Sequence, residues 1–231
     1  MLFVDTETSG WPKDWRKSYA AEDNWPYVVQ VAWIIYDRNG REIKAENHFI
    51  SNDDFSISPT SQKIHGITRE FLRTHGKDRE GVLGILSDDL NRYQPLVVGY
   101  FTQLDYHVLS AEFYRLGRKS PFTALPLFCV MKAAALYSYF PHRRYLSLDR
   151  LYEKLFHTSL VKHHDAYVDA QATARCFFEL RQQGRIGERL IAQQQQSETV
   201  AKVINKQSGA TVFLFLLLLL LLFVVLYWYQ R

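Results

Sequence analysis

The chain opens with the residues MLFVDTET at positions 1–8. Residues 1–5 are apolar up to Asp5, which predicts a short buried strand. Because alternate residues of a strand point to the same face, Asp5 and Glu7 place two carboxylates side by side. Two negative charges this close need a cation between them, or one of them stays protonated, and Mg²⁺ prefers such oxygen ligands. Taken alone, these residues fit two exposed acidic side chains at a strand end equally well.

Outward from this strand, apolar runs and turn signals alternate along the chain. A β-prone run at 28–36 and an alternating run at 42–50 flank Asn39-Gly40, a dipeptide typical of hairpin turns. A short buried strand is predicted at 95–99, and a strand running into a helix at 125–135. Helical patterns cover residues 59–66, 68–75, 79–93, 104–116, 148–156 and 166–183. A hairpin followed by strands that alternate with helices predicts an α/β fold with a mixed β-sheet flanked by helices.

Two further carboxylates and a histidine lie close to predicted strand or helix ends. Asp105 comes shortly after the strand at 95–99, at the start of a helix, where an aspartate is most often a cap or a dipole partner. His164 lies in a loop, and Asp169 lies in the first turn of the long helix that follows. A histidine of near-neutral pKa is a good general base beside a metal-bound water. Each feature is weak alone, and only the combination with the first pair of carboxylates indicates a site.

In order and context, these motifs resemble those of the DEDDh branch of the DnaQ-like 3′–5′ exonucleases. That family carries Asp-x-Glu in its first strand, an aspartate after a Val-Gly strand end, and His-x-Ala-x-x-Asp-Ala before its last helix. The matching residues are Asp5, Glu7, Asp105, His164 and Asp169. The resemblance covers residues 1–184 and implies the ribonuclease H-like exonuclease fold. The chain departs from the pattern at Tyr100-Phe101, where the family has a His-Asn pair.

The resemblance implies a metal-dependent hydrolase that acts on nucleic-acid 3′ ends. It assigns two Mg²⁺ or Mn²⁺ ions to four carboxylates, and the charges of the ions and the carboxylates balance. These metal-binding residues are Asp5, Glu7, Asp105 and Asp169. His164 would be the catalytic base that removes a proton from the attacking water, and the product would be a nucleoside 5′-monophosphate. The partner implied is a single-stranded DNA or RNA 3′ end.

Four residues near these motifs are candidates for substrate binding: Thr6, Thr8, Trp11 and His65. Thr6 and Thr8 alternate with the carboxylates of the first strand, although strand-end packing explains them equally well. Trp11 belongs to a loop whose aromatic residues and cations suit single-stranded nucleic acid, and packing under the loop is equally consistent. His65 lies in the segment 64–68, which resembles the family's turn between its first sheet and its helices. The net charge of +4 is compatible with a phosphodiester partner without indicating one.

Composition is globular on average, but the last part of the chain differs from the rest. Apolar residues make up 47% and charged residues 23%, which excludes a disordered chain. Residues 212–229 form an unbroken apolar or aromatic run, about 27 Å long as a helix, and its lack of a polar face disfavours a buried core helix. We therefore predict a transmembrane helix at 212–229 and a polar helical stalk at 185–211. The excess of cations in the stalk predicts a single-pass C-terminal membrane anchor with the globular part in the cytoplasm.

The leading hypothesis is a 3′–5′ exonuclease domain at 1–184, tethered to membrane lipid by its C-terminal helix. One alternative is a catalytically inactive nucleic-acid-binding scaffold on a membrane anchor, and the complete set of site residues argues against it. Another alternative is an exonuclease specific for RNA or for oligonucleotides. A tethered nuclease fits the clearing of stray nucleic acid at a membrane better than proofreading, which needs no anchor. Since some relatives pair, the resemblance also allows a homodimer.

Overall fold

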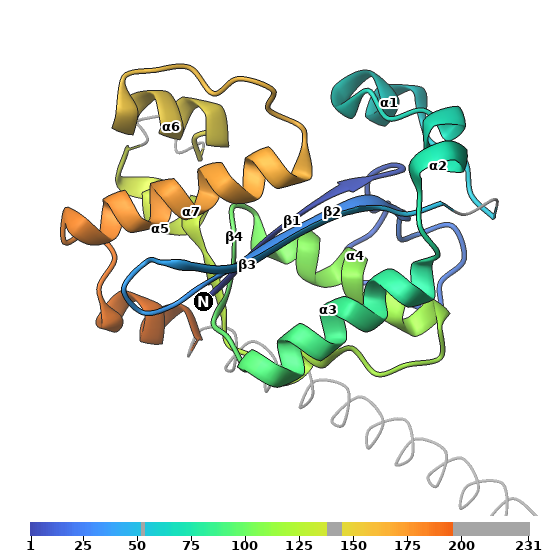
Figure 1. The fold of residues 1–231 in the computed structure, drawn as a ribbon, viewed down its shortest axis with the longest axis horizontal. Coiled ribbons are helices and arrows are strands. Elements are labelled where there is room, and N and C mark those ends of the chain that lie inside the picture. The colour runs from blue at the N-terminus through green and yellow to red at the C-terminus, as the bar shows by residue number, and fades with distance from the viewer. Residues whose placement is uncertain (52–53, 138–144, 196–231) are drawn as a thin grey trace, which may run out of the picture. The chain divides into compact units, whose positions relative to one another are not determined.

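The computed structural model describes residues 1–51, 54–137 and 145–195, and Figure 1 shows their fold. Five strands form the sheet: β1 (Leu2–Thr8), β2 (Val28–Tyr36), β3 (Glu42–Phe49), β4 (Val97–Gly99) and β5 (Leu127–Cys129). The α-helices are α1 (Pro59–His65), α2 (Arg69–His75), α3 (Arg79–Tyr93), α4 (Thr102–Arg115), α5 (Val130–Ala133), α6 (Leu148–Phe156) and α7 (Ala166–Gln182). Two short 3₁₀ helices are η1 (Pro121–Ala124) and η2 (Ala134–Tyr137). Residues Met1–Glu188 form one compact unit.

The sheet has the strand order β3-β2-β1-β4-β5. The central strand β1 is antiparallel to β2 and parallel to β4, while β3 runs antiparallel to β2 and β5 parallel to β4. A central strand is covered on both edges and both faces, which is why Leu2, Phe3 and Val4 are almost completely buried. The polar residues 5–8 follow directly and also pair with β2, so they lie in the interior as well.

Helices cover the two faces of this sheet (Figure 1). On one face, Phe177 of α7 makes an edge-to-face contact with Phe3 of β1, with ring centroids 5.4 Å apart. On the other face, α3 and α4 pack on residues of the alternate register, such as Val4. Side chains of a strand point alternately to its two faces, so Asp5 lies on the α7 side and Thr6 on the α4 side.

The predicted mixed sheet flanked by helices is confirmed, and α3 and α6 have the predicted bounds. The first strand is longer than predicted, because residues 6–8 also pair with β2, with a register shift before Thr8. The helix predicted from residue 104 begins at Thr102. Its hydroxyl oxygen accepts the backbone N–H of Gly99 at 3.0 Å and so ties the start of α4 to the end of β4.

A buried ion network holds the start of β2. Glu112 of α4 is fully buried, accepts the backbone N–H of Val28 at 2.8 Å, and pairs with the guanidinium groups of Arg79 and Arg115 at 2.9 Å. Burial raises the pKa of Glu112, and the two guanidinium groups oppose this shift. Arg115 also donates to the carbonyl oxygen of Trp25 at 2.5 Å. The network therefore fixes α3, α4 and the end of the loop before β2 to one another.

Among the described residues, none of the helices combines the length and the hydropathy that a membrane crossing requires. The predicted transmembrane helix at 212–229 lies outside these residues, as does the part of the predicted stalk from residue 196 onward. Both segments therefore stay predictions.

Candidate active site

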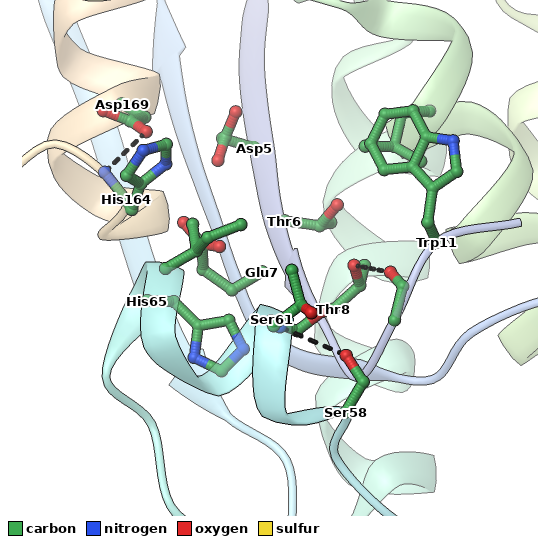
Figure 2. Close-up of a pocket in the computed structure, with 14 residues that line it drawn as sticks. Asp5, Thr6, Glu7, Thr8, Trp11, Ser58, Ser61, His65, His164 and Asp169 are labelled. Atoms are coloured by element: carbon green, nitrogen blue, oxygen red, sulfur yellow. Dashed lines mark hydrogen bonds between the residues drawn. The ribbon is translucent and has the colours of Figure 1, made fainter.

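A pocket of about 670 Å³ opens at the Thr8 end of β1 (Figure 2). Its walls come from β1, the loop that follows β1, helix α1, and the residues around the start of α7. Every site residue predicted from the sequence lines this pocket except Asp105. The fold therefore brings residues 5–11 and residues 164–169 together in one pocket.

Two carboxylates of β1 face a third at the start of α7. Asp5 and Glu7 point from the strand toward Asp169, which lies in the first turn of the helix (Figure 2). Glu7, His164 and Asp169 each offer one ligand atom, and these three atoms all lie within 4.8 Å of one another. The arrangement follows from the strand alternation, which sends Asp5 and Glu7 to the face that α7 covers.

Asp105 reaches the cluster from the opposite face of β1. It is buried in the first turn of α4 but does not cap the helix, because Phe101 occupies the N-cap position. Instead, one carboxylate oxygen of Asp105 accepts the hydroxyl of Thr6 at 2.8 Å. Its negative charge raises the pKa of Asp5, so the two groups interact electrostatically although Asp105 does not line the pocket.

The loop before α7 presents the imidazole of His164 to the pocket. His164 has a positive φ of 66°, a left-handed conformation that histidine adopts more readily than most residues. Its backbone N–H donates to a carboxylate oxygen of Asp169 at 3.0 Å, which fixes the loop to the helix (Figure 2). Asp165 caps α7 by accepting the backbone N–H of Tyr167 at 3.0 Å, and the buried side chain of Gln30 donates to Asp165 at 3.2 Å. Strand β2 therefore helps to hold the start of α7 in place.

Without a bound cation, the pKa values of all four carboxyl groups are raised. Burial, together with the neighbouring negative charges, raises the pKa of Asp5 well above its usual range and that of Glu7 to about 8. Burial also raises the pKa of Asp105 to about 7 and that of Asp169 to about 6. By contrast, burial and the neighbouring His163 lower the pKa of His164. Its imidazole is therefore neutral near pH 7 and able to accept a proton.

The donor set fits a hard divalent cation. Carboxylate oxygens are the ligands that Mg²⁺ and Mn²⁺ prefer. Asp169 keeps one buried carboxylate oxygen without a hydrogen-bond partner among the described residues, and such an orphaned acceptor is costly unless a ligand satisfies it. Within the described part of the chain, none of the four carboxylates has an ion pair with a lysine or arginine. Asp5, Glu7, Asp105 and Asp169 are therefore suited to binding metal.

The raised pKa values predict that the metal-free protein loses stability as the pH rises. Burial raises the pKa of Glu7 from its ordinary value of 4.5, which applies to the unfolded chain, to about 8 in the folded protein. Between these values the folded state binds more protons than the unfolded state, so the free energy of unfolding falls with rising pH. Thermal unfolding of chelator-treated protein across this window measures the fall. Added Mn²⁺ is expected to reverse it, because the metal binds the ionised carboxylates. A melting temperature that increases with pH over this window in chelator contradicts the prediction.

Gly99 at the end of β4 leaves room for Asp105. A Cβ at this position would lie 3.1 Å from a carboxylate oxygen of Asp105 and 3.1 Å from the Cα of Thr102. Because the second contact is with backbone, we expect Asp105 to shift in a Gly99→Ala variant. The variant is expected to bind Mn²⁺ more weakly by calorimetric titration and to lose about 1–3 kcal/mol of stability through overpacking.

Gly84→Ala in α3 is the matched control for this glycine. An added Cβ there meets nothing within 4 Å, so helix propensity predicts a stability gain of up to about 1 kcal/mol. Mn²⁺ affinity should be unchanged in the control. Equal Mn²⁺ affinity in the Gly99 and Gly84 variants would contradict the role of Gly99.

The four candidate substrate contacts differ in how their side chains are engaged. The hydroxyl of Thr6 donates to Asp105, and that of Thr8 donates to the carbonyl oxygen of Gly10 at 2.7 Å. Trp11 is 60% exposed, and its ring stacks on Phe101 with centroids 6.3 Å apart. His65 lines the pocket, its Nδ1 accepts the backbone N–H of Ile67, and burial lowers its pKa. Of the four side chains, Trp11 is the most open to solvent.

Sequence reasoning missed part of the pocket wall. The residues concerned are Gly10, Ser58, Thr60, Ser61, Ile64 and Leu104. Four of them lie on or next to α1, whose N-cap is Ser58. The sequence pattern predicts this helix at residues 59–66, where Ser58 precedes a proline. Nothing in the local pattern indicates that α1 faces β1.

Comparisons with known proteins identify the family and the fold. The sequence profile of the Exonuclease (RNase T) family matches residues 2–177. A search of curated proteins found no match. Among solved structures, the chain is similar to E. coli exonuclease I in complex with a dA16 oligonucleotide, with 20% identity and a TM-score of 0.64. It is also similar to the zinc-bound form of the E. coli exonuclease I complex with single-stranded DNA, with 22% identity and a TM-score of 0.63.

Both similarities concern only part of the larger proteins. Each covers 78% of this chain but 40% of the exonuclease I chain. At this level of identity the likeness shows a shared fold. The chain spans less than half the length of these structural relatives.

Proposed function

This chain belongs to the Exonuclease family, and we propose that it is a metal-dependent 3′–5′ exonuclease that releases nucleoside 5′-monophosphates from single-stranded nucleic acid. One observation carries the proposal: the buried carboxylates and the neutral His164 converge on one pocket, without a lysine or arginine paired to them in the described part of the chain. Carboxyl groups whose pKa values are raised this far are typical of functional sites, here of a cation-binding site. The family and the fold support a nuclease. The 3′–5′ polarity and the number of metal ions are proposed from the resemblance of the sequence motifs.

The proposed roles follow from the contacts of each side chain. Asp5, Glu7, Asp105 and Asp169 would hold two Mg²⁺ or Mn²⁺ ions. Bound there, the ions supply Lewis-acid stabilisation of phosphate charge and a lowered pKa for a water. A ring nitrogen of His164 accepts the proton of the attacking water, and the hydrogen bond of the His164 N–H to Asp169 keeps the imidazole in reach. The hydroxyl of Thr6 orients Asp105 through its hydrogen bond.

Single-stranded nucleic acid is the proposed substrate. The related exonuclease I structures contain single-stranded DNA or oligonucleotides, which supports this choice. The exposed indole of Trp11 at the pocket offers a surface for stacking an unpaired base. Base stacking is tolerant of sequence, because every base has a flat face, so we expect little preference among the four bases.

Hydrolysis of single-stranded DNA and RNA oligomers, assayed side by side with the full chain, tests the proposal. We expect mononucleotide release that requires Mg²⁺ or Mn²⁺ and stops on chelation. Release from RNA alone would favour the RNA-specific alternative. Binding of oligomers without any release under these conditions would overturn the exonuclease and identify an inactive nucleic-acid-binding scaffold.

We also propose that residues 212–229 anchor the enzyme in a membrane, with the exonuclease domain on the cytoplasmic side. The support is the unbroken apolar run, long enough to cross most of a hydrocarbon core of about 30 Å. Detergent-free fractionation of cells that express the full chain is expected to recover it with membranes. Recovery in the soluble fraction would contradict the anchor and leave the exonuclease proposal untouched. The homodimer stays a prediction.

A further inference from the structure

A row of aromatic rings leads away from the mouth of the pocket. We call this group the aromatic row, and it consists of Trp11, Trp15, Phe101, Tyr19 and Tyr114. Trp11 stacks on Phe101, and Trp15 lies 5.8 Å from the rings of both. Further along, the rings of Tyr19 and Tyr114 lie 6.5 Å apart. The row thus joins the loop between β1 and β2 to the surface of α4.

A second layer of rings supports the aromatic row from beneath. Trp25 is buried and stacks on His107 of α4, with ring centroids 5.0 Å apart. Trp15 and Tyr19 pack against Trp25 at 6.0 and 5.5 Å. The outer ends of the row stay open, because Trp11 is 60% and Tyr114 is 50% exposed. Exposed aromatic side chains gathered in this way indicate a binding surface.

The loop that carries the row is fixed in place before any ligand arrives. Asn24 is buried, accepts the backbone N–H of Asp14 at 2.9 Å and donates to its carbonyl oxygen at 3.0 Å. The indole N–H of Trp25 donates to the carbonyl oxygen of Ser18 at 3.2 Å. A loop ordered in this way loses little further conformational entropy when it binds a ligand, which favours affinity.

Exposed cations accompany the rings on the same loop. Lys13, Arg16 and Lys17 are all exposed to solvent. Arg16 pairs with Asp14 at 3.1 Å. Aromatic rings interleaved with cations fit a strand of alternating bases and phosphates, which stacking and charge attraction hold together.

We infer that the aromatic row binds the single strand upstream of the cleaved nucleotide. Trp11 belongs both to the row and to the pocket wall, so a strand whose 3′ end occupies the pocket continues onto the row. Bases stack on the exposed rings, while Lys13 and Lys17 contact phosphates. The inference rests on the proposed function and adds that affinity grows with strand length, because the pocket alone holds only the end of the strand.

Binding of oligothymidylates of two lengths tests the row. An Asp5→Asn background prevents turnover in Mg²⁺, and fluorescence anisotropy gives the dissociation constant for strands of about 4 and about 16 nucleotides. We expect Lys13→Glu/Lys17→Glu/Tyr114→Ala to weaken binding of the long strand at least about tenfold. The loss should grow with length and with falling salt concentration. The matched control is Arg38→Glu/Arg41→Glu in the β2–β3 hairpin, which changes charge equally at exposed positions.

The outcomes separate the row from the proposed function. A similar loss of affinity for the short and the long strand, or an equal loss in the Arg38/Arg41 control, would overturn the inference that the aromatic row binds the strand. Loss of binding to anionic lipid vesicles, with oligomer binding intact, would also overturn it and assign the rings to a membrane surface. If the wild type hydrolyses no strand but the row variant loses binding of the long strand, the exonuclease proposal fails and the inference about the aromatic row stands. If it hydrolyses strands of both lengths and the row variant binds as the wild type does, only the row fails.

Discussion

Replacing Asp5 with asparagine is expected to stop metal-dependent hydrolysis and to raise the melting temperature of the metal-free protein near pH 8. Asp5 has a pKa raised by burial and by the charges of Asp105, Asp169 and Glu7. Asparagine keeps the shape but removes the charge, which relieves this repulsion and deletes a metal ligand. Metal ions stabilise phosphoryl transition states by several kcal/mol. Since about 1.4 kcal/mol corresponds to a factor of ten, the rate should fall at least about 10³-fold.

Steady-state rates with Mg²⁺ and thermal unfolding in chelator and in Mn²⁺ measure the two effects on one preparation. The wild type should gain stability from Mn²⁺, and Asp5→Asn should lose most of that gain. Asp88→Asn on α3 is the matched control, because Asp88 is an exposed aspartate outside the pocket. Activity in Asp5→Asn close to that of the control would refute the role of Asp5.

Replacing Glu112 with alanine is expected to destabilise the fold by about 3–5 kcal/mol. The change removes the 2.9 Å partner of the buried guanidinium of Arg79, which then keeps only the half-exposed Asp54 at 3.1 Å, and it removes the acceptor of the Val28 N–H. Removing the buried partner of a buried charge is among the most costly changes in a protein interior. Urea unfolding of the wild type and the variant gives the difference in free energy.

Glu80→Ala supplies the comparison for Glu112. Glu80 pairs with Arg118 on the surface, where both side chains are largely exposed, and such pairs contribute about 0–1 kcal/mol. Near-equal costs for the two variants would contradict the importance of the buried network. Because this network also fixes the end of the loop that carries the aromatic row, Glu112→Ala should also weaken binding of long oligomers.

The part of the candidate site whose geometry depends on local periodicity could be predicted from the sequence. The alternation of β1 alone puts Asp5 and Glu7 on one face, and the helix start fixes Asp169 behind His164. The order of these motifs along the chain then suggested an exonuclease, and the match over residues 2–177 confirms the exonuclease family. The DEDDh branch and the 3′–5′ polarity stay predictions. The sheet and its helices were predictable for the same reason, because their apolar patterns are regular.

Features that depend on distant contacts could not be derived in this way. Taken alone, Asp105 looked like a helix cap, and only the fold shows that its carboxylate accepts the hydroxyl of Thr6 on the α4 side of β1. No local pattern around Glu112 indicated that its side chain accepts the backbone N–H of Val28 at the start of β2. Trp11 and Tyr114 stand far apart in sequence, yet Tyr19 of the Trp11 loop meets Tyr114 on α4. Such contacts arise from tertiary packing, which one sequence does not encode as a local pattern.

Hydrolysis of a single-stranded oligonucleotide labelled at its 5′ end measures polarity and product size in one assay. The proposed site predicts a ladder of labelled strands that shorten one nucleotide at a time in Mg²⁺ or Mn²⁺, with unlabelled 5′-monophosphates as the other product. Chelation and Asp5→Asn should both abolish the ladder. Early release of the label as a mononucleotide, cleavage at internal positions, or a ladder that persists in chelator would contradict a metal-dependent 3′–5′ exonuclease.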